Sequence, residues 1–83
     1  MEIRVLKYFV ETAKQKSMTK AAKKLYVTQP TLSKQLKDLE DELGQKLFTR
    51  SNYSVNLTAE GEVLYKRAVD ILSIVSKTEA EFK

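Results

Sequence analysis

Side chains that can form directional hydrogen bonds are concentrated in residues 29–37, beside a regular stripe of leucines. The polar positions there are Gln29, Thr31, Ser33, Lys34, Gln35 and Lys37. In the major groove of DNA, glutamine can bond N6 and N7 of adenine, and lysine can bond O6 and N7 of guanine. The stretch therefore has the chemistry of a base-reading helix, although an ordinary amphipathic helix with solvated polar groups would show the same stripe.

The next stretch reverses the charge, because its polar positions are Asp38, Glu40, Asp41 and Glu42. Acidic groups at a helix C-terminus interact unfavourably with the helix dipole, so helix stability does not explain this order. The order does fit a helix whose N-terminal half meets phosphates while its acidic half points away from them.

Charge is divided along the whole chain in the same order, with a basic first part and an acidic second part. Residues 1–37 hold nine Lys and Arg and two acids, a net charge of +7, whereas residues 38–83 hold six Lys and Arg and nine acids, a net charge of −3. No acid lies between Glu11 and Asp38, although seven lysines do. A basic face of this kind is typical of nucleic-acid binding, but lysines that meet only solvent would give the same composition.

Composition also excludes several classes of protein. The chain has no Cys and no His, so it lacks the usual zinc ligands and the usual nucleophile–base pairs. With no Gly-rich phosphate loop either, we expect no enzyme activity, no metal site and no cofactor. No apolar run exceeds three residues, so we expect no contact with a membrane. The absence of cysteine and of a signal-peptide pattern predicts a cytoplasmic protein.

Hydrophobic spacing and capping residues predict the elements that position these groups. We expect helices over residues 2–15, 19–26, 30–43 and 59–82, and two short strands within residues 47–57. The predicted N-caps are Thr19, Thr28 and Thr58, and Gly44 can end the third helix with a positive φ. On the predicted ribbon, Phe48, Val55 and Leu57 face inward.

This order of elements predicts a mainly α fold, a winged helix-turn-helix of three helices and a two-strand wing over residues 1–58. The helix-turn-helix spans about residues 18–37 and the wing about residues 47–57. The wing would lie beside the DNA backbone or minor groove, although a ribbon that merely covers the core would have the same pattern.

The last helix, residues 59–83, is longer than the core of so small a domain requires. Its apolar stripe follows a three–four spacing, and Gly61 would allow close approach to the body of the domain. We expect the distal residues to lack a partner within the chain and to form a two-fold homodimer, unless the helix frays beyond Val75. The predicted interface residues are Leu64, Ala68, Ile71, Leu72, Val75 and Phe82.

Several sequence motifs together resemble the N-terminal DNA-binding domain of LysR-type transcriptional regulators. They are Leu6–Val10, Ser17–Leu25, Val27–Leu36, Leu39-Glu40, Glu42-Leu43-Gly44, Leu47-Phe48, Arg50 and Leu57–Gly61. The stretch VTQPTLSKQL is the most specific of them. At Lys34 the family often has Arg, so this chain keeps the charge but loses the bidentate fork.

The resemblance implies sequence-specific binding of double-stranded DNA at partial palindromes by a dimer of a bacterial regulator. It implies base reading by Thr28, Gln29, Pro30, Thr31, Ser33 and Lys34. The predicted DNA-backbone contacts are Ser17, Thr19, Lys20, Gln35, Lys37, Arg50, Ser51, Asn52 and Tyr53. The alternative is a winged-helix module that binds another protein and reads no DNA.

The resemblance also implies features beyond these 83 residues. An effector-binding domain normally follows the linker helix in this family, and any small-molecule inducer would bind there. Homodimerisation would use residues 59–83, a higher oligomer would form only in the full-length protein, and the protein would associate with the nucleoid.

Overall fold

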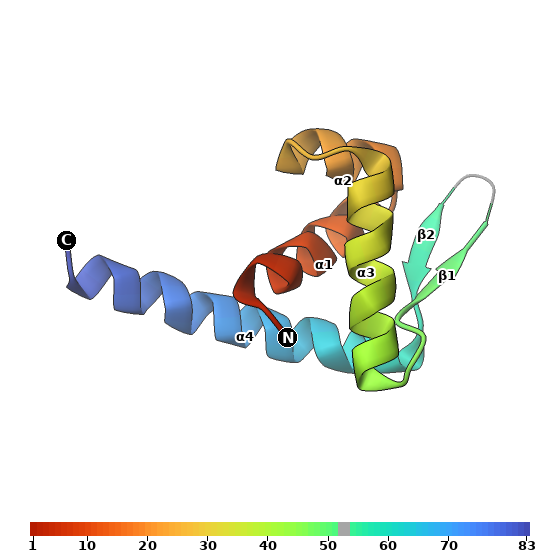
Figure 1. The fold of residues 1–83 in the computed structure, drawn as a ribbon. Helices are drawn as coiled ribbons and strands as arrows, with labels where there is room; N and C mark the ends of the chain where they lie inside the picture. Colours follow the sequence, from red (N-terminus) through yellow and green to blue (C-terminus); the bar gives the residue numbers. More distant parts are fainter. Residues whose placement is uncertain (52–53) are drawn as a thin grey trace.

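A computed structural model describes residues 1–51 and 54–83. Four helices and two strands follow one another in the predicted order (Figure 1). They are α1 (Ile3–Gln15), α2 (Met18–Leu25), α3 (Gln29–Leu43), β1 (Phe48–Arg50), β2 (Val55–Leu57) and α4 (Ala59–Glu81). The mainly α winged helix-turn-helix fold is thereby confirmed.

The helix starts follow from local capping. Thr28 Oγ1 accepts a hydrogen bond from Thr31 N at 3.3 Å, and Thr58 Oγ1 accepts one from Gly61 N at 2.9 Å. The prediction of Thr19 as the cap of α2 is wrong, because Ser17 caps it by accepting from the backbone N–H of Lys20 at 3.2 Å. Lys16 ends α1 in a left-handed conformation, φ +54°, so Ser17 is already extended and free to cap.

The core surrounds α1, which packs against α2, α3, α4 and β2. Phe9 is fully buried, and its ring lies 5.2 Å from that of Phe48 on β1. Because α1 is covered on several sides, its buried face is wide and includes Val5, whereas Ile3 at the end of the helix is 40% exposed. The other buried apolar residues include Leu6, Val10, Ala21, Ala22, Leu32, Leu36, Leu39 and Leu47.

The wing is an antiparallel pair in which Phe48 lies opposite Leu57 and Arg50 opposite Val55. Phe48 and Val55 are buried and Leu57 is half-buried, as the predicted inward face requires. The base of the wing is held by Glu40, whose Oε2 accepts hydrogen bonds from the backbone N–H of Leu47 at 2.8 Å and of Phe48 at 3.3 Å. Glu40 is therefore not a surface acid, since this carboxylate is buried and structural.

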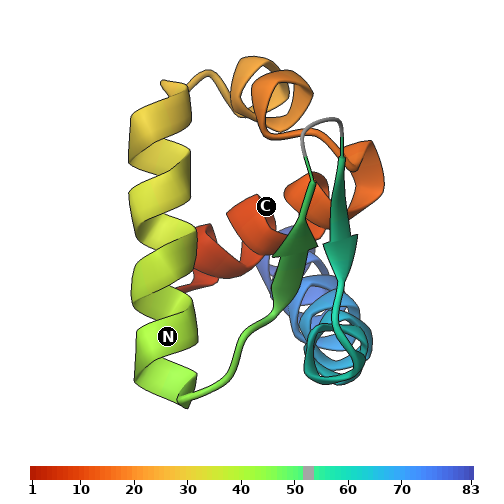
Figure 2. The same cartoon turned by 90° about the vertical axis from the view of Figure 1, so that its right-hand side faces the viewer.

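The helix α4 passes beneath the other elements and continues beyond them to the C-terminus (Figure 1). Figure 2 views it nearly along its axis, with α3 and the wing side by side and α2 above them. Gly61 allows the predicted close approach, because a Cβ there would overlap the carbonyl oxygen of Leu47. Among the described residues, no helix combines the length and the apolar character needed to span a bilayer.

The predicted partner-facing stripe of α4 is partly wrong. Ala68 is fully buried in its own chain, and Leu64, Ile71 and Leu72 are partly buried against the same core. The first half of the stripe is thus covered by α1 and the body of the domain. The exposed large apolar side chains of α4 and its C-cap are Val63, Val69, Ile74 and Phe82, at 62%, 41%, 63% and 86% exposure.

Candidate nucleic-acid interface

The helix α3 buries its leucines, and helical geometry divides its other positions among different sides. One side faces the wing and carries Gln29, Ser33 and Lys37, each of which lines a cavity that wing residues also line. Next to it, Pro30 and Lys34 are exposed to solvent. These five positions form one continuous surface along the N-terminal half of α3, and all of them except Pro30 are polar.

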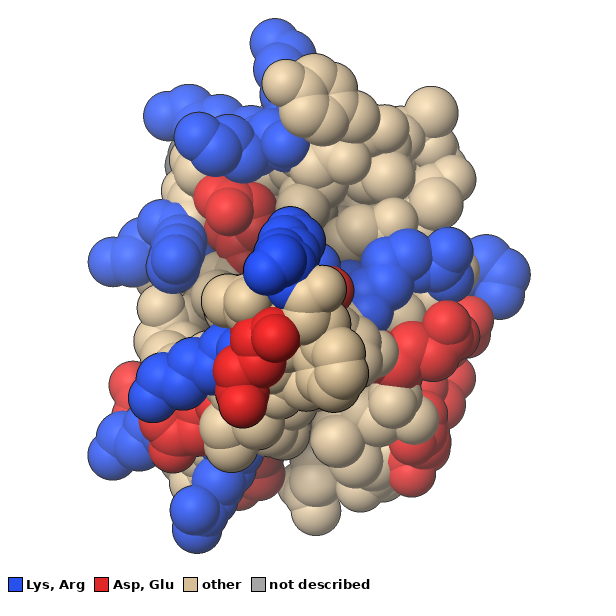
Figure 3. Space-filling view, turned by 90° about the vertical axis from the view of Figure 1, so that its left-hand side faces the viewer, with Lys and Arg blue, Asp and Glu red and all other residues tan. Residues whose placement is uncertain are grey.

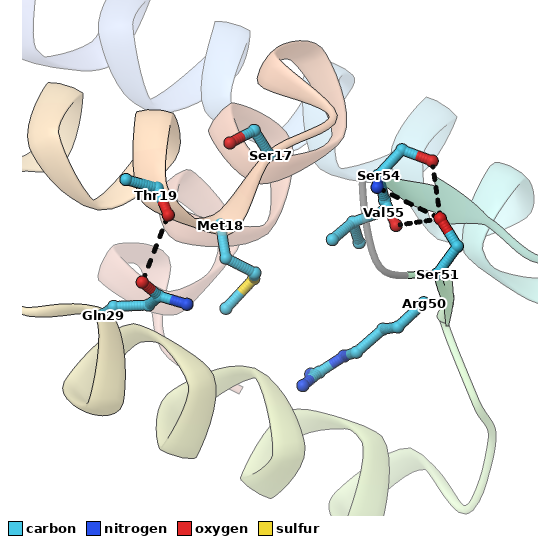
Figure 4. Close-up of a pocket in the computed structure, with 8 residues that line it drawn as sticks. All are labelled: Ser17, Met18, Thr19, Gln29, Arg50, Ser51, Ser54 and Val55. Carbon is cyan, nitrogen blue, oxygen red and sulfur yellow. Dashed lines mark hydrogen bonds between the residues drawn. The ribbon is translucent and has the colours of Figure 1, made fainter.

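A cavity of about 310 Å³ lies between the start of α2, the start of α3 and the wing (Figure 4). Thr19 Oγ1 donates a hydrogen bond to Gln29 Oε1 across it at 3.2 Å. From the other side, the Arg50 guanidinium points toward α3 and donates to Ser33 Oγ at 3.4 Å. The structure therefore brings predicted base-reading and predicted backbone-contacting side chains, Ser17 and Ser51 included, around one polar cavity.

A second cavity, of about 380 Å³, continues along the wing side of α3. It is lined by Ser33 and by three cationic side chains, Lys37, Lys46 and Arg50, with Glu40 and Phe48 behind them. Sequence reasoning missed Lys46. Its signal was its place in the linker directly before the wing, in a half of the chain where basic residues are outnumbered.

Two lysines of α3 pair with acids one turn further along the helix. Lys34 Nζ lies 3.0 Å from Asp38 Oδ2, and Lys37 Nζ lies 3.6 Å from Asp41 Oδ1. Both pairs are solvent-exposed, so each contributes little to stability and can exchange for a phosphate at small cost. The acidic half of α3 thus serves partly as a set of weak counterions for its basic half.

Two predicted contacts lie apart from this surface. Gln35 is half-buried in a small pocket with Val5, Asp38 and Glu42, on the side of α3 away from the wing. Thr31 is exposed at the start of α3, and its hydroxyl accepts a hydrogen bond from the hydroxyl of Thr28 at 2.8 Å. The structure therefore groups Gln35 with acids rather than with Arg50.

The remaining predicted contacts belong to α2 and to the tip of the wing. Lys20 is exposed on α2, as are Lys23 and Lys24. Figure 3 shows Lys and Arg side chains predominating at the upper end of one face, where α2 lies, and Asp and Glu gathering lower down. Asn52 and Tyr53 lie outside the described residues.

Comparison with known proteins identifies relatives of the chain. Residues 3–62 match the family model described as bacterial regulatory helix-turn-helix protein, lysR family. The chain is 53% identical over 73 residues to the HTH-type transcriptional regulator BsdA of Bacillus subtilis (strain 168), covering 87% of this chain and 25% of that protein. It is 47% identical over 74 residues to the HTH-type transcriptional regulator BudR of Klebsiella aerogenes, covering 89% of this chain and 52% of that protein.

A solved structure gives a further match. The chain superposes with a TM-score of 0.95 on the DNA-binding domain of BenM in complex with catB site 1 DNA. That match has 43% sequence identity and covers 99% of this chain and 91% of the other. The chain thus spans a quarter to a half of the length of the two curated regulators, and nearly all of a DNA-bound domain.

Proposed function

Because the chain belongs to the LysR family of bacterial helix-turn-helix regulators, we propose that it is the DNA-reading module of such a regulator. In this role it binds partially palindromic double-stranded DNA as a dimer. The observation that carries the proposal is the polar surface between α3 and the wing, where Gln29 and Ser33 stand beside Lys37 and Arg50. Short polar groups flanked by cations are what base reading and phosphate binding require.

Base contacts and DNA-backbone contacts are proposed to come from different elements. The residues at the start of α3 enter the major groove and read base edges; they are Thr28, Gln29, Pro30, Thr31, Ser33 and Lys34. Backbone contacts come from Ser17, Thr19 and Lys20 of α2, from Lys37, and from Arg50 and Ser51 of the wing. For Gln35, whose pocket is lined by three acids, any phosphate contact requires the side chain to leave that pocket.

Duplex titration tests the reading role. Substituting Gln29 with Ala should reduce the preference for a selected duplex over a random one by about 1–3 kcal/mol, because a bidentate base contact is lost. The matched control is Lys20→Ala, which should weaken binding to both duplexes alike. Equal losses on both duplexes for Gln29→Ala would refute base reading by this residue.

The alternative is a winged-helix module that binds another protein. Phosphate binding releases counterions, so the affinity for duplex should fall steeply as salt rises from about 50 to 200 mM. A protein-binding module with an incidental basic face would bind duplex weakly and without sequence preference. An affinity for duplex that does not change over this salt range would favour the alternative.

Dimerisation is proposed through the part of α4 that its own core leaves uncovered. Ile74 and Phe82 are exposed apolar side chains on that part, and Val75 is half-buried between them. Two-fold pairing would place two copies of α3 about 34–36 Å apart per DNA turn, and the two-fold symmetry of the pair is the reason that the site should be palindromic.

Sedimentation of single variants tests the dimer. Ile74→Glu should shift the protein toward monomer, since it places a charge in an apolar contact. Val69→Glu is the matched control, because Val69 is exposed on another side of the same helix. If both variants sediment like the parent, the interface does not include Ile74.

The family supports further parts of the proposal. The two curated relatives are transcriptional regulators, so we infer a regulatory rather than an enzymatic role, in the cytoplasm and at the nucleoid. The module itself is proposed to need no cofactor or metal; an inducer would bind an effector domain of the full-length protein. A higher oligomer would likewise form only in that longer protein.

A further inference from the structure

The cleft between α3 and β1 contains a cationic residue that the family resemblance does not assign to DNA. Lys46 lines this cleft together with Lys37, Arg50 and Ser33. It is exposed, and it lies in the linker between the end of α3 and the start of the wing. Three cations around one hydroxyl make a site suited to an anion.

The backbone of Lys46 is unusually well fixed for a linker residue. Its carbonyl oxygen accepts a hydrogen bond from the hydroxyl of Thr58 at 2.6 Å, and the next two backbone N–H groups donate to the buried carboxylate of Glu40. Leu47, the following residue, is buried. The linker backbone is therefore already ordered at the cleft, so binding through Lys46 avoids the ordering cost that a mobile loop would add.

The charges of the cleft are not all neutralised within the protein. Lys37 has Asp41 as a partner at 3.6 Å, but among the described residues Lys46 and Arg50 form no salt bridge. The carboxylate of Glu40, which lines the same cleft, is already bonded to two backbone N–H groups. Two cations thus remain available to an external anion.

The geometry of DNA identifies that anion. The major and minor grooves are separated by a sugar–phosphate strand, so a helix in one groove and a wing at the next must have a strand between them. This inference rests on the proposed function. We propose that Lys46 is a DNA-backbone contact of this chain, and that Lys37, Lys46 and Arg50 together hold the phosphates of the strand that passes between α3 and β1.

The test is the salt dependence of duplex binding by Lys46→Gln. Removing one phosphate contact should make the slope of log affinity against log salt shallower by about 0.9 per bound chain. With that difference in slope, the ratio of the parent's duplex affinity to that of Lys46→Gln falls about 3.5-fold between roughly 50 and 200 mM salt. Lys46→Arg keeps the charge and should keep the parent's slope.

The control variant is Lys66→Gln, which makes the same charge change on α4. Lys66 is exposed on the side of α4 opposite the buried Gly61 and Ala68, so its slope should equal the parent's. An unchanged slope for Lys46→Gln overturns the Lys46 contact while leaving the proposed function standing. If the parent itself shows no salt-dependent duplex binding, the proposed function fails.

Free phosphate is the other source of the same chemistry. Inorganic phosphate added at matched sodium concentration should not weaken duplex binding selectively in the parent, because a single small anion does not span the three cations as a strand does. If inorganic phosphate binds the cleft of the free parent but not that of Lys46→Gln, while the two proteins show the same salt slope for duplex, the cleft is a site for free phosphate and the proposal is overturned.

Discussion

Several acids of this chain look like surface residues in the sequence. Among them, Glu40 is the one whose substitution by Ala should lower the stability of the fold most. Glu40 is 7% exposed, and its Oε2 is the acceptor for the N–H groups of Leu47 and Phe48. Alanine would leave both donors in the interior without this acceptor. An unpaired buried N–H costs about 1–3 kcal/mol.

The expected total follows from the two bond lengths. The 2.8 Å bond to Leu47 should count in full and the 3.3 Å bond to Phe48 for less, which gives a loss of about 2–4 kcal/mol. For a domain of this size, each kcal/mol lowers Tm by about 4–8 °C, so the midpoint should fall by roughly 10–30 °C. Such a loss is a large part of a small domain's stability.

Two further variants separate this cause from a change of charge. Glu40→Gln keeps an acceptor oxygen and should cost only about 1 kcal/mol, because the bonds lose their charge assistance. Glu42→Ala removes an exposed acid that pairs with the amino group of Met1 at 2.8 Å, and should cost about 0–1 kcal/mol. Thermal and urea unfolding measure all three. A loss of stability for Glu40→Ala no larger than that for Glu42→Ala would refute the structural role of the Glu40 carboxylate.

Three other predictions concern the same region. Gly61→Ala should destabilise by about 3 kcal/mol in urea unfolding, because its Cβ meets the backbone of Leu47, whereas Gly44→Ala, strained only by φ +68°, should cost about 1–2 kcal/mol. Thr58→Ala should cost about 1–2 kcal/mol by the same measurement, since it removes both the α4 cap and the bond to the Lys46 carbonyl, and a loss below about 0.5 kcal/mol would contradict that. Arg50→Gln should weaken duplex binding and make its salt slope shallower by about 0.9 per chain, whereas Arg50→Lys should keep the slope; equal slopes for both would count against a phosphate contact.

The elements were predictable because their signals are local. Thr28 and Thr58 as caps, Gly44 as a terminator and the leucines of α3 depend on residues within one or two turns, and the structure confirms them. The cap of α2 was misplaced by two residues, from Ser17 to Thr19, because the side chain of Lys16 gives no sign of its left-handed backbone conformation. Such errors shift a boundary without altering the fold.

The site was less predictable because it depends on which side of α3 the wing covers. Glu40 and Gln35 both read as polar positions of one helix, yet the wing buries Glu40 and the start of α1 lies beside Gln35. Periodicity separates an apolar side from a polar one, but it cannot divide the polar side among neighbours. Lys46 was missed for the same reason, since its role depends on Ser33 and Arg50 across a cleft.

The apolar stripe of α4 shows a related limit. A stripe predicts that something covers a face, and not whether the cover is the same chain or a second copy. Here Gly61 and Ala68 are buried in the chain's own core, whereas Phe82 is 86% exposed. The chain's own core therefore covers the first part of the stripe and leaves its distal part uncovered, and the change lies near Ile71 and Leu72, which are partly buried.

Residues 46–48 connect α4 to the cleft between α3 and the wing. Glu40 of α3 holds the N–H groups of Leu47 and Phe48, and the backbone of Thr58 donates to the carbonyl of Leu47 at 2.9 Å. Gly61 then lies directly against that same carbonyl. Because one short backbone segment is bonded to α3, the wing and α4, we expect the angle between α4 and α3 to be fixed rather than hinged. A dimer formed through α4 would therefore set the separation of two recognition helices rigidly, and a site with altered half-site spacing should bind worse than one with an altered base.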